Sequence, residues 1–303
     1  MNLLITGAWS EAKVHIPELE AMGHSVAFLQ QERCELPCDP RWVEGVICNG
    51  LFLYHPIESF PNLRFIQLTS AGYDRVDMDY VRAHNIEIHN AKGVYSIPMA
   101  EFAVAGVLQL YKQARFFHEN QKAHRWEKHR GLLELFGKTV VVVGCGSVGT
   151  ECAKRFKAFG CRVIGVNRTV RESESFETIL PLDQLDEVLP GTDVLILTVA
   201  LTPETTHLMD RRRLGLMPTA AVVVNISRGA VLDETALCEM LVANHLAGAV
   251  LDVFESEPLP ASAPLWDAPN LIVTPHNSFV GEGNNDRLAA VIFTTLSNAS
   301  KEA

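Results

Sequence analysis

Short apolar runs alternate with amphipathic stretches along the first third of the chain. Apolar runs of this length predict buried strands, and the amphipathic stretches between them predict helices. The predicted strands are Asn2–Thr6, Ser25–Leu29, Gly45–Cys48, Arg64–Leu68 and Ile86–His89. Glu11–Met22 predicts a helix that ends at Gly23. Residues 1–95 are therefore expected to form a small parallel α/β unit.

A long helical pattern follows from Ser96 to His118, with Ser96 as the expected N-cap and Pro98 in the first turn. Its apolar residues surround most of the helix, which predicts burial between domains or subunits. The next segment, Glu119–Arg130, is polar and basic and carries Trp126. Two interpretations stay open for this segment: a solvated loop, or an arm in which the tryptophan anchors a subunit interface.

A second series of strands begins at Thr139, and helical segments separate most of its members, as repeated βαβ units require. The predicted strands are Thr139–Val143, Arg162–Val166, Val194–Val199, Ala221–Asn225, Ala249–Asp252 and Leu271–Val273. A last helix, Asn285–Ala299, is expected to return to the first domain. The predicted fold class is α/β, with two Rossmann-like domains built on doubly wound parallel sheets.

Composition narrows the class of protein. The 48% of hydrophobic residues among 303 provide enough apolar material for two cores, as in a soluble globular enzyme. A net charge of −10 repels a phosphate backbone, so nucleic acid is not an expected partner. We expect neither a signal peptide nor a membrane span. Seven cysteines without a CxxC pair or Cys/His ligand spacing predict reduced thiols, no metal site and a cytoplasmic location.

A glycine-rich motif, Gly144–Gly149, lies between a predicted buried strand and a predicted helix, which is the context of a dinucleotide-binding turn. Gly144 permits the tight turn, Gly146 lets the backbone approach a pyrophosphate, and Gly149 lets the helix pack on the strand. The helix N-terminus, with Ser147 and Val148, offers N–H groups to the phosphates. Cys145 is interpreted as a small filler residue. The sequence thus predicts that residues 96–279 form a dinucleotide-binding domain, and that 1–95 with 280–303 form a discontinuous substrate domain.

The next predicted strand ends in Asn167, Arg168 and Thr169. Sites specific for NAD usually carry an acid about 20 residues past the glycines, where it binds the ribose 2′-hydroxyl. Here Arg168 stands in that place, and a guanidinium matches a 2′-phosphate in charge and geometry. The sequence predicts a preference for NADP over NAD, with NAD use still possible. The alternative is a surface arginine that stacks on adenine without discriminating.

Three polar residues follow three later strands: Arg228, Glu257 and His276. In doubly wound sheets the carboxyl ends of the strands line the ligand crevice, so these side chains are expected to face one site. An arginine can bind the carboxylate of a 2-oxo acid and polarise its ketone. The histidine can act as general acid, and the glutamate can orient its ring and favour the protonated form. We interpret the three as a catalytic set for reduction of a small 2-oxo acid by hydride transfer.

These motifs resemble those of the D-isomer-specific 2-hydroxyacid dehydrogenase family, of the glyoxylate/hydroxypyruvate reductase type. The matching segments cover nearly the whole chain in family order. They are Ser70–Asp74, Met99–Glu101, Gly144–Gly149, Thr202–Thr205, Ser227–Gly229, Ala247–Leu259 and Thr274–His276.

The resemblance implies that Arg228, Glu257 and His276 are the catalytic residues, and that the product is the D-2-hydroxy acid. It places the substrate carboxylate at the backbone N–H groups of Ala71 and Gly72, with Arg228 and His276. It also implies a homodimer formed through the long helix and arm. The cofactor neighbours that it adds are Ser96, Ala200, Thr205, Ile226 and Asp252.

Some features leave the function open. Asn277, Ser278 and Phe279 stand where many family members carry a small apolar pair. Basic residues are not clustered in the first domain, which argues against a phosphorylated substrate. A family member that senses dinucleotides as a transcriptional corepressor is the alternative function. A formate dehydrogenase of the same fold is disfavoured, because a glutamine is expected there in place of Glu257.

Overall fold

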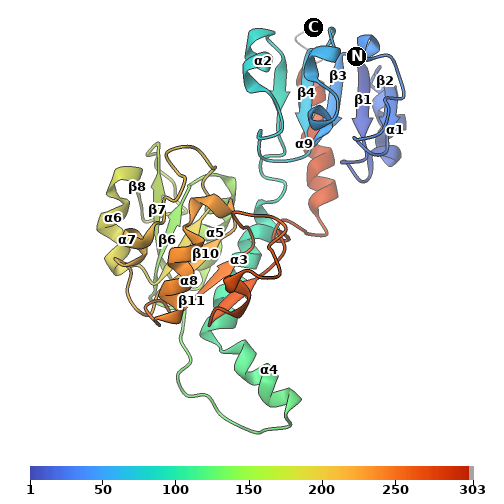
Figure 1. Ribbon diagram of the computed structural model, residues 1–303. Helices are drawn as coiled ribbons and strands as arrows, with labels where there is room; N and C mark the ends of the chain where they lie inside the picture. Colours follow the sequence, from blue (N-terminus) through green and yellow to red (C-terminus); the bar gives the residue numbers. More distant parts are fainter. Residues whose placement is uncertain (300–303) are drawn as a thin grey trace. The chain divides into compact units, whose positions relative to one another are not determined.

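The computed structural model describes residues 1–299, and the chain divides into two compact units (Figure 1). The first unit is Met1–Tyr95 together with the residues from Gly281 on, and the second is Ser96–Val280. The chain enters the second unit at Ser96 and leaves it after Val280. No helix among the described residues is both long and apolar enough to cross a membrane.

The first unit contains a five-stranded sheet in the order β2-β1-β3-β4-β5, in which all pairs are parallel. The strands are β1 Asn2–Thr6, β2 Ser25–Leu29, β3 Gly45–Cys48, β4 Phe65–Leu68 and β5 Glu87–His89, and the helices are α1 Ala12–Ala21, α2 Met78–Ala83 and α9 Asn284–Ala299. Leu288 and Ile292 of α9 pack with Leu3 and Ile5 of β1 in one core. The last described helix therefore belongs to the first sheet, although it comes at the end of the chain.

The second unit contains a seven-stranded parallel sheet in the order β12-β11-β10-β9-β6-β7-β8. Its strands are β6 Thr139–Val143, β7 Arg162–Asn167, β8 Thr178–Pro181, β9 Val194–Leu197, β10 Val222–Asn225, β11 Gly248–Leu251 and β12 Leu271–Val273. Its α-helices are α3 Ser96–Tyr111, α4 Ala114–Lys122, α5 Ser147–Ala158, α6 Leu185–Val188, α7 Arg211–Leu214 and α8 Glu234–Val242. Single turns of 3₁₀ helix span Pro40–Trp42, Leu51–Leu53, Ile57–Ser59, Leu182–Gln184, Leu189–Gly191, Gly229–Val231 and Pro264–Asp267.

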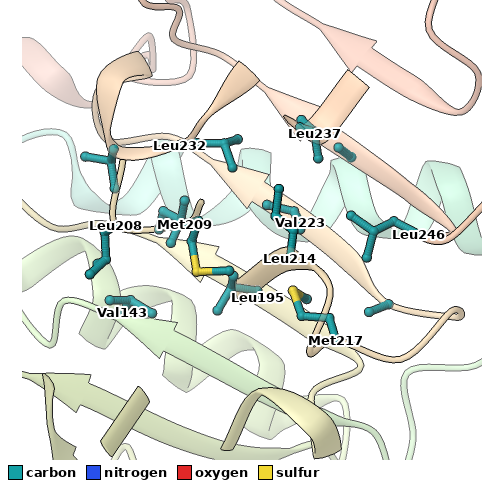
Figure 2. Packing of buried hydrophobic residues seen from close by; sticks show 14 of the residues in the cluster. Val143, Leu195, Leu208, Met209, Leu214, Met217, Val223, Leu232, Leu237 and Leu246 are labelled. Carbon is teal, nitrogen blue, oxygen red and sulfur yellow. The ribbon is translucent and has the colours of Figure 1, made fainter. Parts of the chain in front are cut away.

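Alternate residues of the second sheet face two different cores, which explains its continuous apolar strands. Val141 and Val143 of β6 belong to one cluster, and Val140 and Val142 belong to the other. Figure 2 shows the first cluster, where Val223 of β10 lies among buried leucine and methionine side chains. Full burial of one such side chain is worth about 1.5–3 kcal/mol, so the two cores together fix the sheet that carries the site.

The predicted single helix from Ser96 to His118 is wrong. α3 ends at Tyr111, Gln113 adopts a left-handed conformation with φ of 54°, and α4 begins at Ala114. The Gln113 side chain donates to the Leu110 carbonyl at 3.1 Å, which helps to cap α3. Tyr111 is the last buried residue before the break, so packing rather than helical pattern ends the helix there. α3 also begins at Ser96, which is therefore its first residue rather than its N-cap.

The strand β8 was not predicted from the sequence. Thr178–Pro181 is a short edge strand that pairs only with β7 among the described residues, and it ends in a proline. Such a segment has no clear apolar alternation, and pairing with a neighbouring strand creates it. The other predicted strands are present, and several begin or end one or two residues away from the predicted position. The predicted fold class, α/β with two parallel sheets, is confirmed.

Candidate active site

The strand order of the second sheet reverses between β6 and β9, because β7 and β8 extend to one side of β6 and β10 to β12 to the other. Ligands of doubly wound sheets bind outside the carboxyl ends of the strands at such a reversal. The glycine turn follows β6, and Arg228, Glu257 and His276 follow the adjacent strands β10, β11 and β12. Topology therefore brings all four features to the same edge of one sheet.

The glycine turn depends on residues without side chains. Gly144 has a φ of 103°, and a Cβ there would lie 2.8 Å from the Thr198 carbonyl carbon. A Cβ on Gly149 would overlap the Gly144 carbonyl oxygen, so α5 packs directly on the turn. Thr198, which the sequence analysis did not single out, fastens the turn because its hydroxyl donates to the Gly144 carbonyl at 2.7 Å.

Gly146 differs from the other two glycines, since nothing lies within 4 Å of the position of its Cβ. It is the N-cap residue of α5 and is exposed, and Ser147 and Val148 in the first turn are half-buried. The first N–H groups of a helix have no partner within the helix and carry partial positive charge. An open approach over a bare backbone, leading to these donors, fits the pyrophosphate of a dinucleotide.

The end of β7 is tied to the glycine turn. The side-chain oxygen of Asn167 accepts from the Cys145 N–H at 3.3 Å, and its Nδ2 donates to the Thr169 carbonyl at 2.8 Å. Arg168 is exposed between them. The pKa of Glu204, in the loop after β9, is lowered first by a hydrogen bond from Thr202 and, among smaller causes, by the charge of Arg168.

Cys145 fills space inside the turn. Its sulfur lies 2.5 Å from the position that a Cβ on Gly165 would occupy, so the thiol packs directly on the backbone of β7. Burial raises the pKa of this thiol to about 12, which keeps it in the unreactive neutral form at physiological pH. The contact fits the interpretation of a small filler residue.

Asn225 organises the segment that carries Arg228. It is buried at the end of β10, and its Oδ1 accepts from the Ser227 N–H and hydroxyl at 3.1 and 2.8 Å. Its Nδ2 donates to the Arg228 carbonyl at 2.9 Å. The Arg228 guanidinium in turn donates to the Ser227 carbonyl at 2.8 Å, while Ile226 is buried in the core. The arginine is thus held on a braced turn rather than on a mobile loop.

His276 and Glu257 form a hydrogen-bonded pair. Nδ1 of His276 lies 2.8 Å from Oε2 of Glu257, and the side chains are 42% and 38% exposed. The other oxygen of Glu257 accepts from the Phe254 N–H at 3.0 Å. His276 has a positive φ of 51°, and the Phe279 ring lies edge-on to the imidazole, with centroids 6.1 Å apart. Since Nδ1 is engaged, Nε2 is the ring nitrogen that can exchange a proton with a ligand.

The amino-acid sequence matches a known protein family. A family model described as "D-isomer specific 2-hydroxyacid dehydrogenase, NAD binding domain" matches residues 104–278, more than half of the chain. The chain belongs to this family. Its relatives include a glyoxylate reductase of Korarchaeum cryptofilum, 32% identical over 244 residues, which are 79% of this chain and 74% of that protein. A glyoxylate/hydroxypyruvate reductase B of Serratia proteamaculans is 33% identical over 240 residues, 77% of this chain and 74% of that protein.

Solved structures of the 2-hydroxyacid dehydrogenase family share the fold along nearly the whole chain. A family member from Aeromonas salmonicida is 27% identical with a TM-score of 0.84, and the match covers 99% of this chain and 95% of that one. A dehydrogenase from Xanthobacter autotrophicus, in complex with NADPH and MES, is 28% identical with a TM-score of 0.77 over 96% of this chain and 92% of that one. The expected resemblance to this family is therefore confirmed.

Other residues predicted for the dehydrogenase site have structural partners already. Asp252 is fully buried, and its carboxylate accepts from the Thr274 hydroxyl and from the Asn277 and Ser278 N–H groups at 2.6–2.9 Å. Its backbone carbonyl accepts from the His276 N–H at 2.8 Å. The Asp252 carboxylate thus fixes the segment 274–278, which carries His276. Contact of Asp252 with a cofactor stays a prediction.

The loop after β9 holds two further residues predicted as cofactor neighbours. The Thr205 hydroxyl donates to the Ala200 carbonyl at 2.8 Å and accepts from the Thr202 N–H at 2.7 Å. These bonds shape a compact turn, with Thr205 buried and Ala200 exposed. Ser96, at the start of α3, is also buried. Their contact with a cofactor stays a prediction.

The residues predicted to bind the substrate carboxylate lie in the first unit, in the loop after β4. Asn90 donates to the Ala71 carbonyl at 2.7 Å, and the Ser70 hydroxyl donates to the Gly72 carbonyl at 3.2 Å. The carbonyl groups of this loop are therefore engaged by neighbouring side chains. Substrate binding by the N–H groups stays a prediction.

Proposed function

We propose that this protein reduces a small 2-oxo acid to the D-2-hydroxy acid with a reduced nicotinamide dinucleotide. The observation that carries the proposal is the 2.8 Å pair of His276 and Glu257, which follow β12 and β11, the two strands beyond β10 and Arg228 in the sheet that also carries the glycine turn. A binding protein would need the glycine turn alone, whereas a reductase also needs a cation for the carboxylate and a proton donor for the oxygen.

The bound cofactor supplies the hydride for the carbonyl carbon. Arg228 binds the substrate carboxylate and draws electron density from the adjacent ketone by charge-assisted hydrogen bonds. His276 donates its Nε2 proton to the carbonyl oxygen as negative charge develops there. Glu257 accepts from Nδ1, which fixes the ring orientation and stabilises the imidazolium before transfer. In the oxidative direction neutral His276 takes the hydroxyl proton back.

The cofactor is proposed to be NADPH in preference to NADH. Arg168 is exposed at the end of β7, flanked by the neutral side chains Asn167 and Thr169, with no acid at the place expected to bind the ribose 2′-hydroxyl. A fork of guanidinium donors pairs well with a 2′-phosphate and gains little from a hydroxyl. The relative from Xanthobacter autotrophicus, seen with NADPH, is consistent with this preference.

The substrate is proposed to be glyoxylate or hydroxypyruvate, the acids that appear in the names of several relatives. A panel of 2-oxo acids assayed with NADPH and NADH tests the function, the cofactor and the substrate together. We expect the highest kcat/KM for a two- or three-carbon acid with NADPH. Absence of turnover with every acid in the panel would contradict the enzymatic proposal and favour a dinucleotide-sensing regulator.

The protein is further proposed to form a homodimer through α4 and the segment that follows it, which project from the second sheet (Figure 1). A hollow of about 690 Å³ lies between α4 and Arg125–Arg130. Trp126 is 96% exposed there, and the buried Asn120 side chain has no hydrogen-bond partner among the described residues. An exposed tryptophan beside an unsatisfied amide is typical of a surface that a second copy covers.

The proposed location is the cytoplasm. All seven cysteines lie within the described residues, and all are free thiols. Reducing compartments keep thiols in this form, which supports the proposal. The location within a cell would be read directly from a fluorescent fusion, with accumulation outside the cytoplasm as the contrary result.

A further inference from the structure

The loop Asp252–Glu257 decides where the Glu257 carboxylate lies. One carboxylate oxygen bonds to Nδ1 of His276 at 2.8 Å, and the other accepts from the Phe254 N–H at 3.0 Å within the same loop. A hydrogen bond to the loop's own backbone moves together with that backbone. The geometry of the acid–base pair therefore depends on what holds the peptide units at residues 254 and 255.

Glu234 holds one of these peptide units from outside the loop. It is the first residue of α8, and its Oε1 accepts from the Glu255 N–H at 2.6 Å. The helix N-terminus is capped by a different residue, Asp233, whose side chain accepts from the Ala236 N–H at 2.9 Å. The Glu234 carboxylate is thus not needed for capping, and it fastens a rigid helix to the loop that carries Glu257.

The same peptide unit is packed against the turn that carries Arg228. A Cβ on Gly229 would overlap the Phe254 carbonyl group and the Glu255 nitrogen, so the two backbones are in direct contact. On the other side, Oε1 of Glu255 lies 3.0 Å from Nε2 of His207, in the loop after β9. The peptide between Phe254 and Glu255 is therefore the point at which the loop Asp252–Glu257 contacts the turn that carries Arg228.

The position is a costly one for a carboxylate. Burial is the largest effect and raises the pKa of Glu234, whereas the hydrogen bond from the Glu255 N–H lowers it. The charges of Glu255 and Glu257 raise the pKa by smaller amounts, and the charge of His207 lowers it. An ionised side chain is therefore disfavoured here relative to water. Because the charge of the Glu234 carboxylate weakens the folded state, this residue is expected to have a role other than stability.

We propose that Glu234 is a positioning residue for the acid–base pair: it accepts the Glu255 N–H and so holds Glu257 in register with His276. Glu234 acts through the loop and does not touch the substrate. The inference rests on the proposed function, because turnover of a 2-oxo acid is one of its measurements. The other measurement, hydrogen exchange in the loop, requires neither cofactor nor substrate.

Three variants distinguish the role of Glu234 as a hydrogen-bond acceptor from the effect of its charge and from the effect of its packing. E234M keeps most of the side-chain volume and removes the acceptor. E234Q keeps an acceptor oxygen and removes the charge. E239M is the matched control, because Glu239 lies on the same helix and pairs at the exposed surface with Arg211.

In cofactor-free protein, hydrogen exchange of a peptide covering residues 252–258 is followed by mass spectrometry. We expect the Glu255 amide to exchange about tenfold faster in E234M, and within twofold of the unsubstituted protein in E234Q and E239M. Steady-state kinetics should show about tenfold lower kcat in E234M, with KM and the Kd of NADPH within about twofold. E234Q should restore most of the kcat.

The positioning role would be overturned if exchange and kcat of E234M match the unsubstituted protein, or if E234Q is as impaired as E234M. A Kd for NADPH weakened in proportion to kcat would also overturn it, since that pattern indicates general disruption of the second unit. If the unsubstituted protein turns over no 2-oxo acid, the proposed function fails instead. The two failures are therefore distinguishable.

Discussion

At the scale of single residues, Arg168 tests the cofactor preference. Replacing it with alanine removes the only guanidinium proposed to meet the 2′-phosphate and leaves the glycine turn unchanged. We expect kcat/KM for NADPH to fall by about 10–100-fold while kcat/KM for NADH changes by less than about threefold. The ratio of the two constants in steady-state assays is the measurement.

The matched control for this prediction is R171A, since Arg171 is exposed in the same loop. That variant should keep the NADPH preference of the unsubstituted protein. An equal loss with both cofactors in R168A would mean that the arginine stacks on adenine without discriminating. A preference of the unsubstituted protein for NADH would contradict the assignment outright.

Residue by residue, the sequence predicts what a motif or a strand end can specify. The glycines, Arg228, Glu257 and His276 could be proposed as site residues because their chemistry is visible in their type and order. Thr198, Asn225 and Glu234 could not, because each of these polar side chains gains its role only from the backbone groups that the fold brings to it. The bonds of the Asp252 carboxylate to the Asn277 and Ser278 N–H groups were likewise not predictable from the sequence.

At the scale of elements, the turn between β6 and α5 separates ligand binding from folding. The Cβ of G146A would enter open space, whereas the Cβ of G149A would overlap the Gly144 carbonyl. We expect G146A to keep the Tm within about 2 °C and to weaken NADPH binding at least tenfold. G149A should instead lower the Tm by about 5 °C or more. Thermal melting and fluorescence titration with NADPH are the measurements.

Equal effects of the two substitutions would contradict this division of labour. In particular, unchanged NADPH affinity in G146A would show that the open backbone over α5 is not where the pyrophosphate binds. An unchanged Tm in G149A would show that the turn can move away from the helix at little cost.

The start of α8 predicts how stability depends on pH. The folded-state pKa of Glu234 is raised above its ordinary value of 4.5, mainly by burial. Ionisation therefore lowers the free energy of unfolding. This loss of stability is absent below the unfolded-state pKa and develops as pH rises through the folded-state pKa. E234Q should have the Tm of the unsubstituted protein near pH 4 and a Tm about 1–2 °C higher near pH 8.

Differential scanning calorimetry across this pH range checks the prediction, with E239M as the control for loss of a surface carboxylate on the same helix. A Tm of E234Q that falls below that of the unsubstituted protein as pH rises would contradict the sign. Glu255, Glu257 and His207 face the same carboxylate, so the comparison is made between variants that leave those three unchanged.

The elements also show where sequence patterns stop being informative. The strands of the second sheet were predictable because both of their faces are buried and their apolar runs are continuous. The end of α3 at Tyr111 was not predictable, because the helical pattern continues through Gln113, where the backbone adopts a left-handed conformation. β8 forms because its four residues pair with the free edge of β7. The sequence of those four residues does not by itself reveal this pairing.

At the scale of the whole molecule, the proposed dimer depends on a segment that packs little within its own chain. W126A should lower the dimer affinity by at least tenfold, because exposed aromatic anchors carry much of the energy of interfaces. Sedimentation velocity at micromolar concentration should show dimers of the unsubstituted protein and a larger share of monomer in W126A. W266A is the control, since Trp266 is also half-exposed but lies far along the chain, after β11.

A monomeric unsubstituted protein would contradict the proposed dimer, as would a dimer unaffected by W126A. The two-unit architecture itself follows from chain order, since the chain enters the second unit at Ser96 and leaves it after Val280. The oligomeric state, in contrast, depends on surfaces whose partners a single sequence does not reveal.

The most direct test measures two quantities in H276A, the kcat for a 2-oxo acid and the Kd of NADPH, and compares each with that of the unsubstituted protein. Nε2 of this histidine is proposed to donate the proton, and Glu257 at 2.8 Å orients it. We predict kcat for the preferred 2-oxo acid about 10²–10⁴-fold lower, with the Kd of NADPH within about twofold. Near-normal turnover in H276A would contradict the account.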